Sequence, residues 1–323
     1  MSHRVMILAA PFMRHEPKAG APLREAGVEV LRGPLEPLRT ASEVIDALQG
    51  CDGVIASMEP YTAEVFDALP RLKSLARWGV GYDSIDIEAA SAARVIVTNT
   101  PGRVTESVAD QTFCLMLALA RRLPEQMSVA RSCDWCQVEG IEIWNKTLGI
   151  IGLGSIGQAV ARRAGGFSMR VLAHDPYAEP FHAGRLNASL VSLEELIAES
   201  DVITLHAVLT EETQEMIGEE QLRAMKPSAL LINCGRGGLV DQSALVRALE
   251  EEWIAGAALD ALAPEPPAGD DPVLSAPNTI MTPHNSSMTA ESAARVNATV
   301  CENMLCSLKG QKPRFVVNTA VLD

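Results

Sequence analysis

The chain has 323 residues, which is long enough for two domains that each bury a core of their own. Its net charge of −14 and isoelectric point near 4.9 argue against a nucleic acid or an anionic membrane as partner. A hydrophobic content of 47% with only 4% aromatic residues is typical of aliphatic helices packed on a parallel sheet. We therefore expect an acidic, cytoplasmic α/β enzyme.

Short apolar runs alternate with helical patterns through the first hundred residues. The predicted strands are residues 5–9, 28–31, 53–56, 75–76 and 95–97. Helical patterns at residues 42–48 and 62–69 lie between them. This alternation predicts a parallel sheet, and the early strand leaves no room for a signal peptide. The apolar stretch 108–119 includes Asp110 and Gln111 and is too short to span a membrane, so we expect a buried or interface helix.

The seven cysteines are scattered and odd in number, which favours a reducing compartment. Cys133 and Cys136 form a CxxC pair, but no second pair lies at zinc spacing and no strand ends just before it. We interpret these two cysteines as structural or incidental.

A glycine-rich turn follows the next apolar run, residues 147–151. It consists of Gly152, Gly154 and Gly157 in GxGxxG spacing, and a helical pattern begins directly after it. Strand, tight turn and helix in this order are what a dinucleotide-binding unit requires. The pyrophosphate would lie on free N–H groups at the start of the helix.

An acidic residue at the expected distance supports this interpretation. Asp175 ends the apolar run 170–174, 18 positions after Gly157. Its carboxylate would accept hydrogen bonds from an adenosine 2′-hydroxyl and repel a 2′-phosphate, so NAD is favoured over NADP. The same residue also suits a turn before Pro176, and the two roles are compatible.

Further predicted strands continue this second series. They begin at Leu148, Val171, Val202, Leu230, Ala257 and Thr279. The last helical pattern, residues 289–308 with Gly310 as its stop, comes after that sheet is complete. We therefore predict a discontinuous substrate domain at residues 1–98 and 289–323 and an NAD-binding domain at residues 99–288, with the site in a cleft spanned by two crossings of the chain.

Polar side chains collect where the strands of the second series end. These residues are His206, Arg236, Asp260 and His284. Ligands of open α/β sheets bind at the carboxyl ends of the strands. Each residue alone has an ordinary structural explanation, but together they predict an active site.

Hydride transfer to a ketone assigns roles to these residues. His284 is suited to donate a proton to the developing alkoxide, and Glu265 would hold the imidazolium. Arg236, between Gly235 and Gly237, offers a planar fork for a substrate carboxylate. Asp260 would accept a hydrogen bond from the nicotinamide carboxamide. No ligand cluster suggests a metal.

Taken together, the motifs resemble those of the NAD-dependent D-isomer-specific 2-hydroxyacid dehydrogenases. The matching segments are residues 77–83, 105–110, 149–157, 205–210, 233–237, 265–266 and 282–284. The resemblance implies two Rossmann-like, doubly wound parallel-sheet domains and a homodimer formed mostly by the NAD-binding domains. It implies that Arg236, Glu265 and His284 are catalytic and that Val80 and Gly81 help to bind the substrate carboxylate, and we add Ser57 to that set. The expected NAD-binding residues are Thr105, Gly152, Gly154, Ser155, Ile156, Gly157, Asp175, His206, Cys234, Arg236, Asp260 and His284.

Within this family the chain resembles the phosphoglycerate dehydrogenase-like branch, with departures. Glu59 stands in a first-domain loop where many of those enzymes place a phosphate-binding arginine, and we expect it to repel a phosphate. The chain ends at Asp323, where many of those enzymes continue into a regulatory domain. Gly235 before the arginine, and Asn285 and Ser286 after the histidine, are expected to make the pocket roomier or more polar.

The predicted function is reversible reduction of a small 2-keto acid to a D-2-hydroxy acid with NADH. Oxidation of D-3-phosphoglycerate is the alternative in the same class. Phosphite and formate oxidation stay open, although formate enzymes of the family typically carry glutamine where Glu265 stands. An alternative of another class is an NAD(H)-sensing corepressor that binds partner proteins, against which the complete catalytic set argues.

Overall fold

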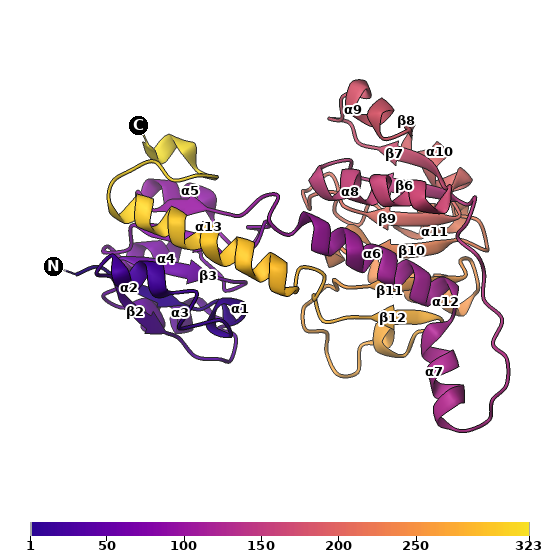
Figure 1. Cartoon of the computed structure of the whole chain (residues 1–323), viewed down its shortest axis with the longest axis horizontal. Helices are drawn as coiled ribbons and strands as arrows, with labels where there is room; N and C mark the ends of the chain where they lie inside the picture. Colours follow the sequence, from indigo (N-terminus) through magenta and orange to yellow (C-terminus); the bar gives the residue numbers. More distant parts are fainter. Residues whose placement is uncertain (1, 323) are drawn as a thin grey trace. The chain divides into compact units, whose positions relative to one another are not determined.

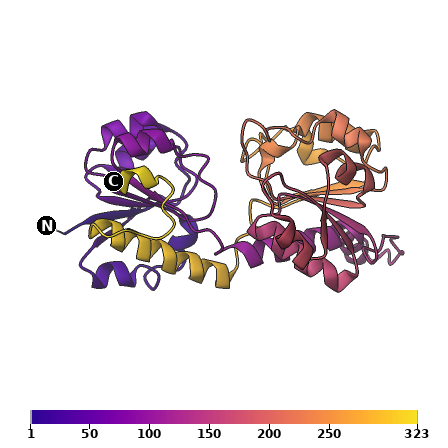
Figure 2. The same cartoon turned by 90° about the horizontal axis from the view of Figure 1, so that it is seen from above.

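The chain folds into two compact units in a computed structural model. The first comprises Met1–Val104 and Met288–Asp323, and the second is Thr105–Ser287. The structure describes the backbone of residues 2–322 and their side chains except that of His182. Each unit is a parallel sheet with helices on both faces (Figures 1 and 2).

The first unit is built on five parallel strands in the order β2-β1-β3-β4-β5. The strands are β1 (Arg4–Ile7), β2 (Glu29–Arg32), β3 (Gly53–Ala56), β4 (Ser74–Arg77) and β5 (Ile96–Thr98). Its helices are α1 (Ala10–Met13), α2 (Ala21–Glu25), α3 (Ala41–Leu48), α4 (Ala63–Ala68), α5 (Ile87–Ala92), α13 (Ala290–Leu308) and the 3₁₀ turn η4 (Thr319–Leu322).

The long helix α13 returns from the far end of the chain to complete the first unit (Figure 1). Thr289 caps it by accepting the backbone N–H of Ser292 at 3.1 Å, and Gly310 with φ +68° follows its end. Its buried Asn297 accepts a hydrogen bond from the indole N–H of Trp78 at 2.7 Å. The helix therefore belongs to the fold of the first unit. In the sequence, the whole of the second unit, Thr105–Ser287, lies between this helix and the earlier part of the first unit.

The second unit contains seven parallel strands in the order β12-β11-β10-β9-β6-β7-β8. The strands are β6 (Thr147–Ile151), β7 (Arg170–His174), β8 (Ala188–Leu190), β9 (Val202–Leu205), β10 (Leu230–Asn233), β11 (Gly256–Leu259) and β12 (Thr279–Met281). Its helices are α6 (Thr105–Ala120), α7 (Leu123–Arg131), α8 (Ser155–Ala164), α9 (Pro180–Arg185), α10 (Leu193–Glu199), α11 (Glu219–Ala224) and α12 (Gln242–Glu250). Three 3₁₀ turns complete it: η1 (Gly165–Phe167), η2 (Gly237–Leu239) and η3 (Pro272–Ser275).

The strand order of the second unit is that of a doubly wound dinucleotide-binding sheet. The chain starts in the middle at β6, proceeds outwards through β7 and β8, and then crosses back to β9 on the other side of β6. Residues of α6 and α8 cover one face in one apolar cluster, and residues of α10, α11 and α12 cover the other face in a second. The crossover places a topological switch point between β6 and β9, where such sheets bind their ligands.

The predicted fold class is confirmed, and one strand was missed. β8 is a three-residue edge strand, Ala188–Leu190, which is too short to produce a recognisable alternation. The apolar stretch 108–119 lies inside α6, as expected of a buried helix. In the part of the chain that the structure describes, no helix is both long and apolar enough to cross a membrane.

Candidate active site

One row of residues runs along the carboxyl edge of the second sheet. The last residues of six neighbouring strands lie in register, in the order His174, Ile151, Leu205, Asn233, Leu259 and Met281. The residues that follow them are Asp175, Gly152, His206, Cys234, Asp260 and Thr282. Because neighbouring strands lie about 4.8 Å apart, this edge spans about 24 Å from Asp175 to Thr282. The polar residues that the sequence places at strand ends are therefore brought onto one edge.

The glycine-rich turn after β6 leaves open space at its centre. Gly152 has φ +92°, and a Cβ there would lie 2.5 Å from the backbone N of Ala207. A Cβ at Gly157 would lie 2.1 Å from the carbonyl oxygen of Gly152, so only glycine lets α8 start this close to β6. Gly154 has no atom within 4 Å of its hypothetical Cβ. The turn can thus receive a pyrophosphate at Gly154 next to the first N–H groups of α8.

Asp175 keeps acceptor capacity at the far end of the row. One carboxylate oxygen accepts the N–H of Leu153 at 2.8 Å, and the other accepts the N–H of Tyr177 at 2.9 Å. A carboxylate offers about four lone-pair sites, so these two bonds fix its orientation and leave sites open. A ribose diol can therefore still bind there.

His206 is half-buried beside the glycine-rich turn, and its ring Nδ1 is fully buried. Its Nε2 lies 2.9 Å from the hydroxyl of Thr204, and among the described residues its buried Nδ1 has no hydrogen-bond partner. Burial lowers the pKa of His206 to about 3, so the imidazole is neutral at physiological pH. An unsatisfied buried nitrogen at this edge indicates a place for a ligand atom or a water molecule.

His284 and Glu265 form a hydrogen-bonded pair after β11 and β12. Nδ1 of His284 lies 2.7 Å from Oε2 of Glu265, and Oε1 of Glu265 accepts the N–H of Leu262 at 3.0 Å. Both side chains are partly exposed, at 35% and 27%. The Glu265 carboxylate accepts a hydrogen bond, so we assign a proton to Nδ1 of His284. Nε2 of the same ring is then left to face a substrate.

Arg236 lies in the loop after β10, against the loop that carries Glu265. The side-chain amide of Asn233 donates to the carbonyl of Arg236 at 2.9 Å, and Nη1 of Arg236 donates to the carbonyl of Gly235 at 3.0 Å. A Cβ at Gly237 would lie 2.0 Å from the carbonyl carbon of Leu262. Glycine at this position therefore allows the arginine loop and the glutamate loop to touch.

In the first unit, the expected substrate-binding residues follow β3 and β4. These strands pair with Ala56 opposite Arg77, so Ser57 and the segment after Arg77 leave the same edge of that sheet. The side-chain amide of Asn99 donates to the carbonyl of Val80 at 2.7 Å. This bond holds the backbone of Val80 and Gly81 in a defined loop.

Comparison with known proteins assigns the chain to a family. Residues 113–286 match the model of the "D-isomer specific 2-hydroxyacid dehydrogenase, NAD binding domain". A glyoxylate reductase from Korarchaeum cryptofilum is 43% identical over 286 residues, which cover 86% of each chain. The chain belongs to the D-isomer specific 2-hydroxyacid dehydrogenase family.

Two more relatives extend the match. The TT0316 protein from Thermus thermophilus has a solved structure that is 40% identical, with a TM-score of 0.87 over 97% of this chain and 99% of its own. A D-3-phosphoglycerate dehydrogenase from Methanocaldococcus jannaschii is 39% identical over 305 residues, 92% of this chain and 58% of its own length. The predicted class, an NAD-dependent 2-hydroxyacid oxidoreductase, is thereby confirmed.

The second unit of this dehydrogenase fits NAD. Spare acceptor sites on Asp175, open space at Gly154 and the unsatisfied Nδ1 of His206 follow one another along the edge. The hydroxyl of Thr105 at the start of α6 lies 3.4 Å from that of Ser155 at the start of α8. The edge thus offers N–H groups, hydroxyls and one carboxylate to a dinucleotide.

The carboxylate of Asp260, by contrast, is fully engaged within the dehydrogenase itself. It is 2% exposed, and its two oxygens accept bonds from four donors in the loop after β12. The nicotinamide carboxamide would have to replace one of them. The sequence did not indicate Thr282 and Ser286 as these partners, because isolated hydroxyl residues in a loop carry no distinctive pattern.

Three expectations about the pocket are wrong in their geometry. Glu59 is 5% exposed and accepts the N–H of Ser57 at 2.7 Å, so it is turned into the first unit, where burial raises its pKa. A Cβ at Gly235 would lie 3.1 Å from the carbonyl oxygen of Leu205, in the protein interior. Ser286 is 4% exposed. All three positions are thus directed into the protein, whereas Asn285 is exposed.

The cysteines of the dehydrogenase are all free thiols. Burial raises the pKa of Cys234 to about 11, so this thiol beside the active-site edge is a poor nucleophile. Cys133 and Cys136 are exposed and lie after α7, away from any strand end.

Proposed function

We propose that this dehydrogenase reduces a small, unphosphorylated 2-keto acid, of the class of glyoxylate, to the corresponding D-2-hydroxy acid with NADH. The observation that carries the proposal is the 2.7 Å pair of His284 and Glu265 on the edge that also bears Arg236 and the glycine-rich turn. The names of similar proteins support the substrate class, because several of these proteins are glyoxylate reductases.

In the proposed reaction, NADH, when bound along this edge, would supply a hydride for the keto carbon. Arg236 binds the substrate carboxylate through its planar guanidinium, which orients the adjacent carbonyl. Nε2 of protonated His284 donates a proton to the carbonyl oxygen as it becomes a hydroxyl. Glu265 holds Nδ1 of His284 and stabilises the positive charge of the imidazolium before the proton is transferred. The imidazole regains a proton from water after product release.

The remaining binding roles are part of the same proposal. Ser57 and the backbone of Val80 and Gly81 bind the substrate carboxylate from the first unit. The NAD-binding set is Thr105, Gly152, Gly154, Ser155, Ile156, Gly157, Asp175, His206, Cys234, Arg236, Asp260 and His284. Asp175 selects NADH over NADPH because a 2′-phosphate would meet its negative charge. Seven free thiols support a cytoplasmic location.

D-3-phosphoglycerate is the second candidate substrate. The Methanocaldococcus jannaschii relative of that name is 39% identical, and Glu59 is turned into the first unit, where its carboxylate accepts the N–H of Ser57. This relative is less similar than the glyoxylate reductase at 43% identity, so the unphosphorylated class is preferred.

We further propose that the enzyme is a homodimer joined through the α7 arm, residues 121–146. Five of the thirteen exposed large apolar side chains of the described chain belong to this arm: Leu123, Met127, Trp135, Ile141 and Trp144. α7 buries none of its own residues, and Figure 1 shows it projecting from the body of the second unit. A second copy of the chain is the occupant that would cover this surface.

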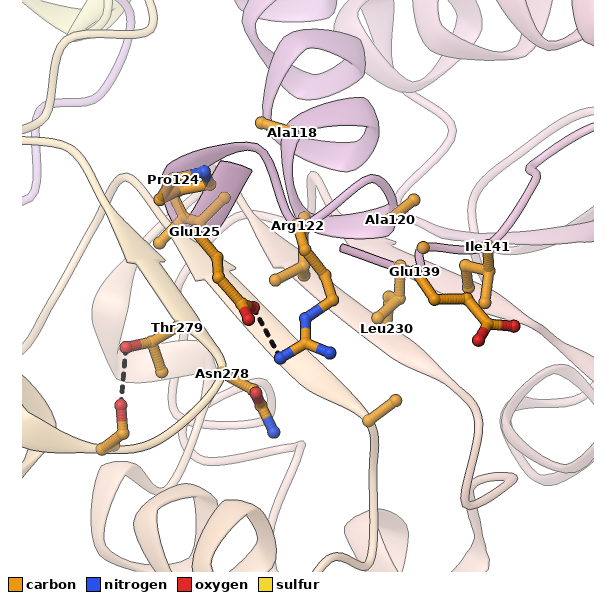
Figure 3. A pocket seen from close by; sticks show the side chains of 15 residues that line it. Ala118, Ala120, Arg122, Pro124, Glu125, Glu139, Ile141, Leu230, Asn278 and Thr279 are labelled. Carbon is orange, nitrogen blue, oxygen red and sulfur yellow. Dashed lines mark hydrogen bonds and ion pairs between the residues drawn. The ribbon is translucent and has the colours of Figure 1, made fainter. Parts of the chain in front are cut away.

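A cavity of about 700 Å³ lies at the root of the α7 arm (Figure 3). Leu230 and Thr279 begin β10 and β12, so the cavity lies at the amino ends of the strands, opposite the active-site edge. Arg122 and Glu125 form an ion pair across it at 2.5 Å. Its mixed apolar and charged lining, remote from the catalytic residues, supports a contact between subunits.

The first test is NADH oxidation followed at 340 nm with a panel of keto acids. The panel contains glyoxylate, hydroxypyruvate, pyruvate, longer 2-keto acids and 3-phosphohydroxypyruvate, and His284→Ala is the control. Turnover of an unphosphorylated acid that His284→Ala abolishes is the expected result. Exclusive use of the phosphorylated acid would favour the second candidate, and tight NADH binding without turnover of any acid would favour an NAD(H)-sensing corepressor.

A further inference from the structure

His284 has a backbone conformation that its own side chain does not favour. Its φ is +48°, in the left-handed region that residues with a Cβ seldom adopt. Its N–H donates to the carbonyl oxygens of Asp260 and Thr282, both at 2.9 Å. Such a conformation persists only where the surroundings hold it, so the loop must contain the groups that do so.

The buried carboxylate of Asp260 is the group that gathers this loop. Its Oδ1 accepts the N–H of Asn285 at 2.8 Å, and its Oδ2 accepts the N–H of Ser286 at 2.8 Å. Successive N–H groups beside a left-handed residue form a concave site for an anion, and here the anion is a side chain of the same protein. The hydroxyls of Thr282 and Ser286 donate to the same two oxygens.

Ser286 donates to this carboxylate twice. Its side chain is buried, and both its backbone N–H and its hydroxyl donate to Oδ2 of Asp260. Because Asp260 directly follows β11, these bonds tie the end of β11 to the loop after β12. The hydroxyls of Ser286 and Thr282 and the two backbone donors together fill the roughly four lone-pair sites of the carboxylate.

We propose that the Ser286 hydroxyl is a positioning residue for the reaction: with Asp260 it holds His284 in the left-handed conformation that directs the imidazole at Glu265. The inference rests on the proposed function, in which His284 donates the proton. The four protein donors on this carboxylate hold the loop in place. Loss of the Ser286 hydroxyl, which is outside the proposed NAD-binding set, loosens the loop.

The test compares Ser286→Ala with wild type, with Ser287→Ala as the control in the same loop. We expect kcat to fall about 10- to 100-fold, because a displacement of the order of 1 Å in a catalytic group has an effect of this size. The Kd for NADH should stay within about twofold, and the solvent deuterium isotope effect on kcat should rise as proton donation becomes slower. Ser287→Ala should match wild type in all three measurements.

Hydrogen exchange and a second variant test the positioning role without relying only on the kcat of Ser286→Ala. In NADH-free protein, hydrogen exchange of the amides of Asn285 and Ser286 should be faster in Ser286→Ala than in wild type, because the carboxylate that protects them becomes mobile. Thr282→Val, which removes the other hydroxyl donor, should change kcat and exchange in the same direction. If Ser286→Ala does not fold, Thr282→Val serves as the test by itself.

The outcomes separate the two proposals. If His284→Ala keeps its activity, the proposed function fails. If His284→Ala is inactive while Ser286→Ala and Thr282→Val keep wild-type kcat and exchange rates, only the positioning role is overturned. A large rise in the Kd for NADH with unchanged kcat would also overturn it, because Ser286 would then act on cofactor binding and not on the proton donor.

Discussion

Glu265 lies 2.7 Å from Nδ1 of His284, and in the proposed reaction its negative charge stabilises the imidazolium. A Glu265→Gln side chain still offers an oxygen to Nδ1 but no negative charge for the imidazolium that the reaction needs. We expect kcat to fall about 100-fold or more, at the lower end of what general acid catalysis contributes. Steady-state rates with the best keto acid check this, with Glu291→Gln, a first-turn residue of α13, as the control for lost charge. A Glu265→Gln enzyme with wild-type kcat would contradict the assigned role.

The half-buried His206 predicts a pH dependence of stability. The folded protein binds a proton at this ring only near pH 3, whereas the unfolded chain binds it near pH 6.5. The unfolded state therefore gains protons first as the pH falls, and stability is lost progressively from about pH 6.5 towards pH 3, by at most about 1.4 kcal/mol per pH unit.

His206→Gln isolates that contribution. Between pH 7 and pH 5, the fall in the free energy of unfolding should be smaller in the variant by about 2 kcal/mol, which is one proton over roughly 1.5 pH units. Urea unfolding at the two pH values measures it, and the Cε1–H signal of His206 should keep its neutral shift down to pH 4. An equal pH dependence in both proteins would show that the ring is accessible to protons in the folded state.

At the scale of elements, the start of α8 depends on the absence of one methyl group. A Cβ at Gly157 would lie 2.1 Å from the carbonyl oxygen of Gly152, which is backbone and cannot rotate away. Gly157→Ala should therefore push α8 from β6, distort the glycine-rich turn and raise the Kd for NADH at least 10-fold, with a loss of stability of a few kcal/mol.

Gly166→Ala is the matched control for this element. Gly166 lies in η1 directly after α8, and nothing is within 4 Å of its hypothetical Cβ. The Gly166→Ala variant should bind NADH as wild type does, and its melting temperature should lie within a few degrees of that of wild type. Fluorescence titration with NADH and thermal melts compare the two variants, and equal NADH affinity in both would refute the proposed tight approach of α8.

At the scale of the whole molecule, the exposed α7 arm predicts the oligomeric state. Met127→Asp places a charge on an apolar surface that a second copy would bury, so it should shift the protein from dimer to monomer. Leu35→Asp is the control, because Leu35 is 75% exposed in the first unit, outside the arm. Sedimentation velocity measures both. A wild-type monomer, or an unchanged dimer in Met127→Asp, would reject the arm as the interface.

Much of the fold and of the site could be predicted from the sequence because the signals are local. A strand followed by GxGxxG and a helix requires glycine at set positions, and residues that directly follow apolar runs must reach the carboxyl edge of a parallel sheet. His284, Arg236, Asp260 and His206 were placed at this edge in this way, and the structure has each of them directly after a strand or in the loop that follows one. β8 was not predicted, because a strand of three residues is too short to show an alternating pattern.

The directions of side chains were decided only by the tertiary structure. Nothing in the sequence shows that Glu59 turns inward, that a Cβ at residue 235 would face the interior, or that Asp260 is saturated by Thr282, Asn285 and Ser286. These outcomes depend on which donors and apolar groups from distant segments surround each side chain, since a buried polar group takes the partners that packing provides. The sequence by itself determined the fold class, the family and the cofactor, because their signals are local. The tertiary structure decided which polar groups face a ligand and which hold the protein together.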